Sequence, residues 1–456
     1  MSAPDGGPAQ GDGPDHRRRP ADGIAASRVR GSGAYRRLLV ATGAANLADG
    51  LQVVAVPWLA SVLTRDPVQI ALVTAATRIP WLLFSLPVGA ITDRYDRRRL
   101  IGWADTARTG LLLAFALLLT LRGAQAAEPP PRAGLLLAGL YALALLVGFA
   151  EVVSDNSSQT LIPSIVPRER LETANGRLWA VETVANQFVG PPLAGLLIAA
   201  GMALPFFVGA GGFAVAAAVV FTIAGHFRAP VGDGPRAGLR REIGEGLRWL
   251  WRHRLLRSLA ISLGVLNASS ALATAVFVLF GQEVAGLDAA AFGLLLTGSA
   301  VGAVLGSFVA PWLTRRIRPR TALAISVVVM GIAEASLGLM SAFWPLWSAT
   351  LVAGVFIVVW NVITVSLRQS LIPDRLLGRV NSVYRFFGWG TIAVGTLLGG
   401  VLVAALEPAL GREWALRLPF LVSGVIQLAL LAWAWPRIGN GPIAAARAAG
   451  SPTSPT

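Results

Sequence analysis

The residues of this chain with the clearest chemical potential are a few ionisable side chains inside long apolar runs. Asp49 lies about halfway along the run 38–63, and Arg78 about halfway along the run 68–92. A charged group at the centre of a bilayer costs about 2.5–3.5 kcal/mol, so it needs a partner, a wet cavity or a function. Antiparallel spans would place these two residues at a similar depth. They are therefore candidates for a coupling pair that exchanges a proton for substrate, with a fixed structural ion pair as the equally weighted alternative.

Two further acids share one face of a predicted helix. Glu151 and Asp155 are four residues apart in the run 134–160 and could bind a proton or a cationic drug. We slightly favour the alternative that Asp155 only pairs with an arginine of the segment 93–99 and holds the inner side closed. In the internal repeat described below, Glu151 corresponds to Asn361, so this acid occurs in one half of the chain alone.

A third group of charges is expected to be structural. Asp105 and Arg108 are three residues apart in the run 100–121, so we expect them to neutralise each other. Glu182 and Glu334 also lie within apolar runs, and their residue types and spacing assign them no role.

Membrane-spanning helices must position these side chains, because the composition excludes a soluble globular protein. Hydrophobic residues make up 54% of the 456 residues and charged residues only 14%, against roughly 25% charged in soluble domains. A helix crosses the hydrocarbon core with about 20 apolar residues. The predicted fold class is an all-α membrane protein with twelve transmembrane helices, at 38–63, 68–92, 100–121, 134–160, 175–200, 204–227, 257–281, 290–313, 321–341, 346–371, 381–405 and 415–435.

Arginine clusters on alternate loops indicate the orientation of these spans. Short cytoplasmic loops accumulate Arg and Lys, so we predict a multi-pass protein with both termini in the cytoplasm. The net charge of +15 is not gathered in a soluble basic domain, so no nucleic-acid partner is expected. The clusters lie at 17–37, 94–99, 168–177, 228–257, 315–320 and 375–379, with Arg437 after the last span.

The residue types that are absent exclude several kinds of chemistry. The chain has no cysteine and no lysine, which removes disulfides, thiolate metal sites, cysteine nucleophiles and a Walker A loop. His16, His226 and His253 lie at a terminus or at span ends, away from any buried metal site. We therefore expect no metal, no other cofactor and no enzymatic activity.

The chain contains an internal repeat. The sequence QTLIP ends the fourth apolar run at 159–163, and QSLIP ends the tenth at 369–373. Two related six-helix bundles are a transporter architecture with its binding site near the midplane between them. We predict bundles at 35–227 and 257–436, joined by a cytoplasmic linker at 228–256 that carries an interfacial helix from residue 239 to residue 256. Disordered cytoplasmic tails are predicted at 1–34 and 437–456.

Two motifs carry a family resemblance. Gly89-x-x-x-Asp93-Arg94-x-x-Arg97-Arg98 resembles the loop between spans two and three of the major facilitator superfamily. Gly190-Pro191-x-x-Ala194-Gly195 resembles the span-five motif of its antiporters, with Ala194 in place of a second glycine. The segments 76–80 and 245–250 look like the macrolide-efflux and enterobactin-exporter branch, and the whole resemblance covers residues 35–436.

This resemblance implies roles for both motifs. Asp93, with Arg94, Arg97 and Arg98, would hold the cytoplasmic side closed by lying near the start of span eleven, where a helix N-terminus favours an anion. Topogenic charge is the alternative for these arginines. The matching loop at 314–318 lacks the aspartate, so the gate is expected on one side only.

The span-five motif has two interpretations as well. The resemblance implies that a bend at Gly190, Pro191 and Gly195 limits leak in exporters. Alternatively, these small residues simply allow close helix packing.

The sequence thus predicts a secondary transporter in the cell membrane, and the resemblance suggests a bacterial plasma membrane. The expected activity is proton-coupled export of an amphipathic small molecule such as a drug, an antibiotic or a siderophore, by alternating access in a monomer. A ligand-binding sensor or scaffold, or an importer of the same fold, is the alternative.

Overall fold

The computed structural model describes residues 21–92, 95–121, 133–225, 227–228, 239–372 and 374–438. Two of the predicted gate residues, Asp93 and Arg94, lie outside these ranges, as do the first 20 residues and those after 438.

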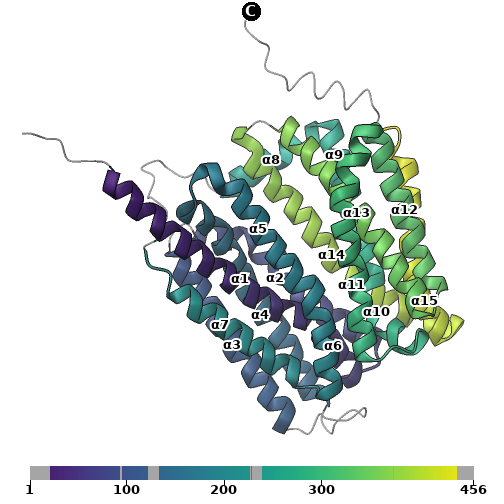
Figure 1. The fold of residues 1–456 in the computed structure, drawn as a ribbon. Coiled ribbons are helices and arrows are strands. Elements are labelled where there is room, and N and C mark those ends of the chain that lie inside the picture. The colour runs from purple at the N-terminus through teal and green to yellow at the C-terminus, as the bar shows by residue number, and fades with distance from the viewer. Residues whose placement is uncertain are drawn as a thin grey trace, which may run out of the picture.

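Every regular element in the described part of the chain is a helix (Figure 1). Within the described ranges, twelve segments are long and apolar enough to cross a membrane, which confirms the predicted fold class. The physical reason is that lipid offers the backbone no hydrogen-bond partner, so each apolar run must satisfy its N–H and C=O groups within itself.

The elements form two consecutive series along the chain. The first comprises α1 (Ala21–Leu63), α2 (Pro67–Thr92), α3 (Arg97–Leu121), α4 (Ala133–Ile165), the 3-10 turn η1 (Arg168–Arg170), α5 (Leu171–Thr183), the π-helix η2 (Val184–Val189), α6 (Gly190–Ala200) and α7 (Leu204–Phe221). The second comprises α8 (Leu239–Arg252), α9 (Arg254–Thr274), α10 (Phe277–Leu279), the π-helix η3 (Phe280–Val284), α11 (Ala289–Arg316), α12 (Pro319–Leu339), α13 (Phe343–Leu371), α14 (Asp374–Leu410) and α15 (Arg412–Ala434).

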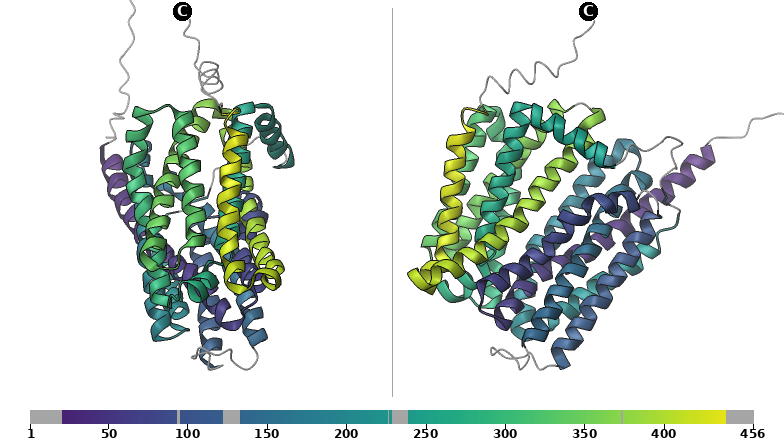
Figure 2. Two further views of the ribbon diagram at one scale, coloured as in Figure 1. Left: turned by 90° about the vertical axis from the view of Figure 1, so that its right-hand side faces the viewer. Right: turned by 180° about the vertical axis from the view of Figure 1, so that it is seen from behind.

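In space these series make two bundles. Helices α1 to α7 lie on one side and α9 to α15 on the other, as the views in Figure 2 show. The start of α1 and the end of α15 lie at the same end of the molecule as α8, which we call the α8 end (Figure 1). The bundles meet where α2 packs on α14 and α6 packs on α11.

The N-terminus differs from the prediction. Helix α1 begins at Ala21, inside the segment 1–34 that was predicted to be a disordered tail. Ala and Arg are good helix formers, and extending an existing helix costs far less than nucleating a new one. The spanning helix therefore continues well beyond its apolar run.

Helix α8 lies outside both bundles and packs on α14 and α9. Leu250 is fully buried against the second bundle, and the Trp251 ring stacks on Phe387 with centroids 6.3 Å apart. The predicted helix at 239–256 is in fact two helices. His253 has an extended backbone, and its Nδ1 accepts a hydrogen bond from the Leu256 N–H at 3.3 Å, so it ends α8 and caps α9.

Candidate functional site

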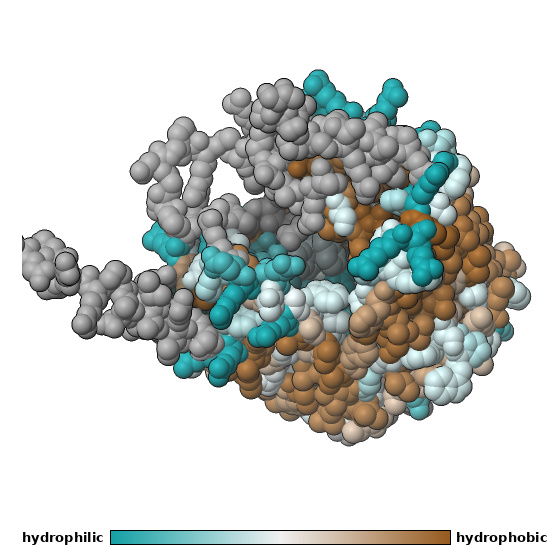
Figure 3. All heavy atoms as spheres, turned by 45° about the horizontal axis from the view of Figure 1, so that its top comes forward, coloured by the Kyte–Doolittle hydropathy of each residue, from teal (hydrophilic) through white to brown (hydrophobic). Residues whose placement is uncertain are grey.

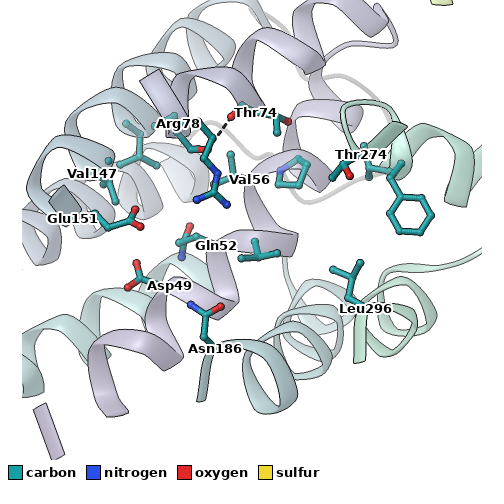
Figure 4. Close-up of a pocket in the computed structure, with 18 of the residues that line it drawn as sticks. Asp49, Gln52, Val56, Thr74, Arg78, Val147, Glu151, Asn186, Thr274 and Leu296 are labelled. Carbon is teal, nitrogen blue, oxygen red and sulfur yellow. Dashed lines mark hydrogen bonds between the residues drawn. The ribbon is translucent and has the colours of Figure 1, made fainter. Parts of the chain in front are cut away.

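A cavity of about 270 Å³ lies between the two bundles, and we call it the central cavity. Its two walls differ in character. The first bundle supplies all of the charged side chains, whereas the second supplies one hydroxyl and an apolar surface. The polar wall includes Asp49, Gln52, Thr74, Thr77, Arg78, Glu151 and Asn186, several of which converge in Figure 4, and the opposite wall comprises Thr274, Phe277, Val278, Phe292 and Leu296.

Asp49 forms an ion pair with Arg108 of α3, and Arg78 is not its partner. Arg108 is only 1% exposed, and its Nη1 also lies 3.5 Å from Asp105 Oδ1. The Ser154 hydroxyl donates to Asp105 Oδ1 at 3.2 Å. The Arg108 guanidinium lies 3.8 Å from the centroid of the Phe213 ring, which adds a cation–π contact. A single arginine thus neutralises acids from two helices.

Sequence reasoning missed this role of Arg108. The spacing of Asp105 and Arg108 predicted a pair within one helix, and that pair exists at the long distance given above. The sequence did contain a hint of this pair. Arg108 lies near the middle of its span, as Asp49 does, so the two residues lie at a similar depth in the membrane.

Arg78 lines the same cavity as Asp49 but has no carboxylate partner among the described residues. Its guanidinium lies 5.5 Å from the centroid of the Trp389 ring, on α14 of the opposite bundle. Trp389 also stacks on Trp81, with centroids 5.3 Å apart and ring planes at 20°. Arg78 and the two tryptophans therefore meet where α2 packs on α14.

Glu151 and Asp155 face two different cavities. Glu151 lines the central cavity and accepts a hydrogen bond from Trp81 Nε1 at 3.3 Å. Asp155 lines a second cavity of about 110 Å³, which we call the polar cavity. Asp49 lines both cavities and so lies between them. The polar cavity is also lined by Asn46, Asp105, Arg108, Ser154, Ser158, Gln159 and Glu182.

The described part of the charged loop contacts its own bundle. Arg97 Nη1 donates to the Thr160 carbonyl at 2.9 Å, and Arg98 Nη1 donates to the Ile223 carbonyl at 2.7 Å. Within the described residues Asp155 forms no ion pair with either arginine. These two arginines therefore tie α3 to α4 and to the end of α7, and their predicted gating role remains a prediction.

The span-five motif packs against helices of both bundles. A Cβ on Gly190 would lie 2.6 Å from the Gly50 Cα, and a Cβ on Gly195 would lie 2.2 Å from the Ala289 carbonyl oxygen of α11. Both distances are shorter than any real Cβ contact. The π-helix η2 directly precedes the motif and carries Asn186, which lines the central cavity beside Asp49.

The bundles are joined by an ion pair and by hydrogen bonds at the end opposite α8. Arg65 Nη1 of the first bundle lies 3.5 Å from Glu283 Oε1 of the second. Arg412, also of the second bundle, has its Nε 2.8 Å from Glu283 Oε2, and its Nη2 donates to the Arg65 carbonyl at 2.8 Å. Gln282 of the second bundle also donates to the Ser61 hydroxyl at 2.8 Å. The face at the α8 end, by contrast, is hollowed between the bundles (Figure 3). This conformation is therefore open toward the α8 end and closed at the other.

Replacing Arg412 with glutamine is expected to favour opening of this closed end. Arg412 Nη2 donates to the Arg65 carbonyl of the first bundle at 2.8 Å, and its pair with Glu283 holds that carboxylate beside Arg65. Exposed charged contacts contribute up to about 1 kcal/mol, so losing this link should raise the open population up to about fivefold. Distances between spin labels placed on the two bundles measure this population. Arg437→Gln, at the other end of the last span, is the matched control, and an unchanged Arg412→Gln distance distribution would count against the gate.

Twelve helices of spanning length among the described residues, arranged in two bundles with a charged cavity between them, are the architecture of a transporter of the major facilitator fold. Residues 29–433 match the family model described as transmembrane secretion effector, and the chain belongs to this family of the major facilitator superfamily.

Two curated relatives cover most of the chain. The enterobactin exporter EntS of Salmonella choleraesuis (strain SC-B67) is 25% identical over 386 residues, which is 82% of this chain and 87% of that protein. The multidrug efflux pump Tap of Mycobacterium tuberculosis (strain ATCC 25618 / H37Rv) is 28% identical over 403 residues, which is 86% of this chain and 92% of that protein.

Solved structures share the fold at low sequence identity. A mutant of the nucleoside transporter NupG superposes with a TM-score of 0.73 at 12% identity, covering 89% of this chain and all of that one. A bacterial homologue of the iron transporter ferroportin has a TM-score of 0.65 at 18% identity, covering 88% of this chain and 98% of that one.

Proposed function

We propose that this protein exports an amphipathic small molecule in exchange for protons, by alternating access of the central cavity. The observation that carries the proposal is the buried Asp49–Arg108 pair in the wall of a cavity between two bundles. Export and drug or siderophore substrates are supported by the two relatives, which are named as an enterobactin exporter and a multidrug efflux pump.

The ion pair between Asp49 and Arg108 offers a simple way to couple proton entry to substrate export. While Asp49 is ionised it attracts Arg108 and can also attract a cationic group in the central cavity. A proton on Asp49 removes both attractions, so proton and substrate compete for one carboxylate. One charge crossing 100 mV provides about 2.3 kcal/mol, and about 1.4 kcal/mol is a factor of ten, so one proton supports a substrate gradient of tens-fold.

The cavity walls suit an amphipathic substrate. The apolar wall would receive a hydrophobic surface, and Phe277 and Phe292 provide aromatic faces there. Arg78, Glu151 and the amides of Gln52 and Asn186 would bind polar groups on the opposite side. The amide nitrogen and oxygen of Gln52 are buried without a partner among the described residues, which leaves a donor and an acceptor free for a ligand.

We place the protein in the bacterial plasma membrane as a monomer with both termini in the cytoplasm. The arginine-rich loops support this orientation, because they gather at the α8 end. The open end of the structure would then face the cytoplasm, where an exporter takes up its substrate. The contacts of Arg65 with Glu283 and Arg412 would seal the outer side.

Drug accumulation in cells that express the protein tests the proposal. We expect lower accumulation of an amphipathic drug than in control cells, with the difference removed by an uncoupler and by Asp49→Asn. Glu172→Gln, an exposed acid on α5, should behave as the unmodified protein. Higher accumulation would indicate an importer, and no change across a panel of drugs would favour a sensor or scaffold. Efflux that an uncoupler does not reduce would contradict proton coupling.

A further inference from the structure

The polar cavity has an excess of negative charge that the mechanism above does not use. Asp49, Asp105, Asp155 and Glu182 line it, while Arg108 is the only cation that lines it among the residues that the structure describes. Arg108 contacts Asp49 and Asp105, which leaves Asp155 and Glu182 without an ion-pair partner among the described residues. Several carboxylates in a low-dielectric site repel one another, so this cavity favours binding of a cation.

A second observation also points to a ligand in the polar cavity. Arg108 is 1% exposed and lines the cavity, yet its Nε has no hydrogen-bond partner in the described part of the chain. A buried N–H without an acceptor costs about 1–3 kcal/mol, so a water molecule or another small acceptor is expected beside it. A hydrated cavity allows protons to move between carboxylates.

The two cavities succeed each other along α4. Glu151 lines the central cavity and Asp155 lines the polar cavity one turn further on, which is about 6 Å along the helix axis. The remaining lining residues place the polar cavity between Asp49 and the α8 end. Leu38 and Thr42 precede Asp49 on α1, and Gln159 follows Asp155 toward the end of α4.

The proton is the cation that fits this arrangement. Within the described residues, no group of three acids or histidines is close enough to hold a metal ion. At about 110 Å³ the cavity has room for a few water molecules and none for an amphipathic drug.

We propose that the polar cavity is a proton-binding site separate from the substrate cavity, in which Asp155 and Glu182 accept the proton that Asp49 releases. This inference rests on the proposed proton-coupled export. The O–H bond of the Asp49 carboxylic acid breaks, and an O–H bond forms on Asp155, directly or through water. Asp49, again a carboxylate, re-forms its pair with Arg108. The proton then leaves through the polar cavity toward the α8 end while substrate occupies the central cavity.

The charged groups that face Asp155 come from four helices. Glu151 is on its own helix, Asp49 is on α1, Asp105 and Arg108 are on α3, and Glu182 is near the end of α5. Four of these five neighbours are acids, so a proton on Asp155 relieves repulsion from every side except that of Arg108.

Infrared difference spectroscopy of the purified full-length protein in liposomes tests the inference without any substrate. Protonated carboxyl groups have their own C=O stretching band, so the difference between acidic and alkaline samples reports which acids titrate. We expect Asp155→Asn with Glu182→Gln to lose part of the titrating band, and Asp49→Asn to lose a different part. Glu172→Gln is the matched control on exposed surface. Gel filtration and unfolding temperatures verify that each isosteric variant is folded.

Two results would overturn the separate proton site. One is an unchanged carboxyl C=O band in the Asp155→Asn, Glu182→Gln variant. The other is loss of the whole carboxyl C=O band in Asp49→Asn, which would indicate a single proton site. The drug-accumulation assay decides the proposed export independently. If export is absent but the band behaves as expected, the proton site stands and the exporter proposal fails. If export is uncoupler-sensitive but the band of the double variant is complete, the inference alone fails.

Discussion

Replacing Arg108 with leucine is expected to abolish active efflux and to destabilise the first bundle. Arg108 is 1% exposed and is the shared cation for Asp49 and Asp105. Removing one partner of a buried ion pair costs about 3–5 kcal/mol, because the remaining charge is left uncompensated. Efflux in cells and the unfolding temperature of the purified protein measure the two losses.

Two further variants separate the structural effect from the transport effect. Adding Asp49→Asn and Asp105→Asn to Arg108→Leu removes the unpaired charges, so stability should return while uncoupler-sensitive efflux stays absent. Arg78→Leu is the matched control for stability, since Arg78 has no ion pair among the described residues. Wild-type efflux in the Arg108→Leu protein would contradict the coupling role of the pair.

Gly195→Leu is the second change expected to have a large effect, and we expect it to stop transport with the fold retained. A Cβ at this position would lie 2.2 Å from the Ala289 carbonyl oxygen and 2.8 Å from the Ala290 Cα. Backbone atoms cannot move aside as a flexible side chain can, so α6 and α11 must separate. Overpacking costs about 1–3 kcal/mol, and this contact lies at the closed end, so the strain disfavours that closed state.

Spin-label distances across the closed end measure this shift, together with efflux in cells. Gly211→Leu on α7 is the matched control, because an added Cβ there meets nothing within 4 Å. Gly293→Ala should resemble Gly195→Leu in a milder form, since its Cβ would lie 2.3 Å from the Pro191 carbonyl oxygen. If Gly195→Leu keeps the short spin-label distances of the closed end and shows normal efflux, the contact between α6 and α11 tolerates a side chain and the prediction is wrong.

The spans and their number followed from the amino-acid sequence because lipid makes hydropathy a strict constraint. The ends of the helices were predicted less accurately from the sequence. Helix α1 extends back to Ala21, and the linker helix breaks at His253, because local helix propensity and capping operate outside the membrane, where hydropathy carries no information.

For the site, a charged residue in an apolar run was a sufficient signal to find lining residues. Asp49, Arg78 and Glu151 all line the central cavity. The residues that pair with these charged side chains could not be predicted in the same way. Arg108 pairs with Asp49 across helices, and Glu283 with Arg412 joins distant segments at the closed end. The repeat could indicate two bundles, but it could not indicate which face of each helix meets which neighbour.

The twelve spans and the charged residues within them can be predicted from the amino-acid sequence, because each is a local property of composition, length and spacing. Three contacts depend on the packing of the helices: Asp49 pairs with Arg108, Glu151 and Asp155 face different cavities, and Gly195 contacts α11. These contacts could not be predicted because they depend on the rotation of each helix about its own axis. Depth in the membrane follows from position along a helix, whereas the direction of a side chain depends on how close-packed small residues set the rotation and tilt of every helix against its neighbours.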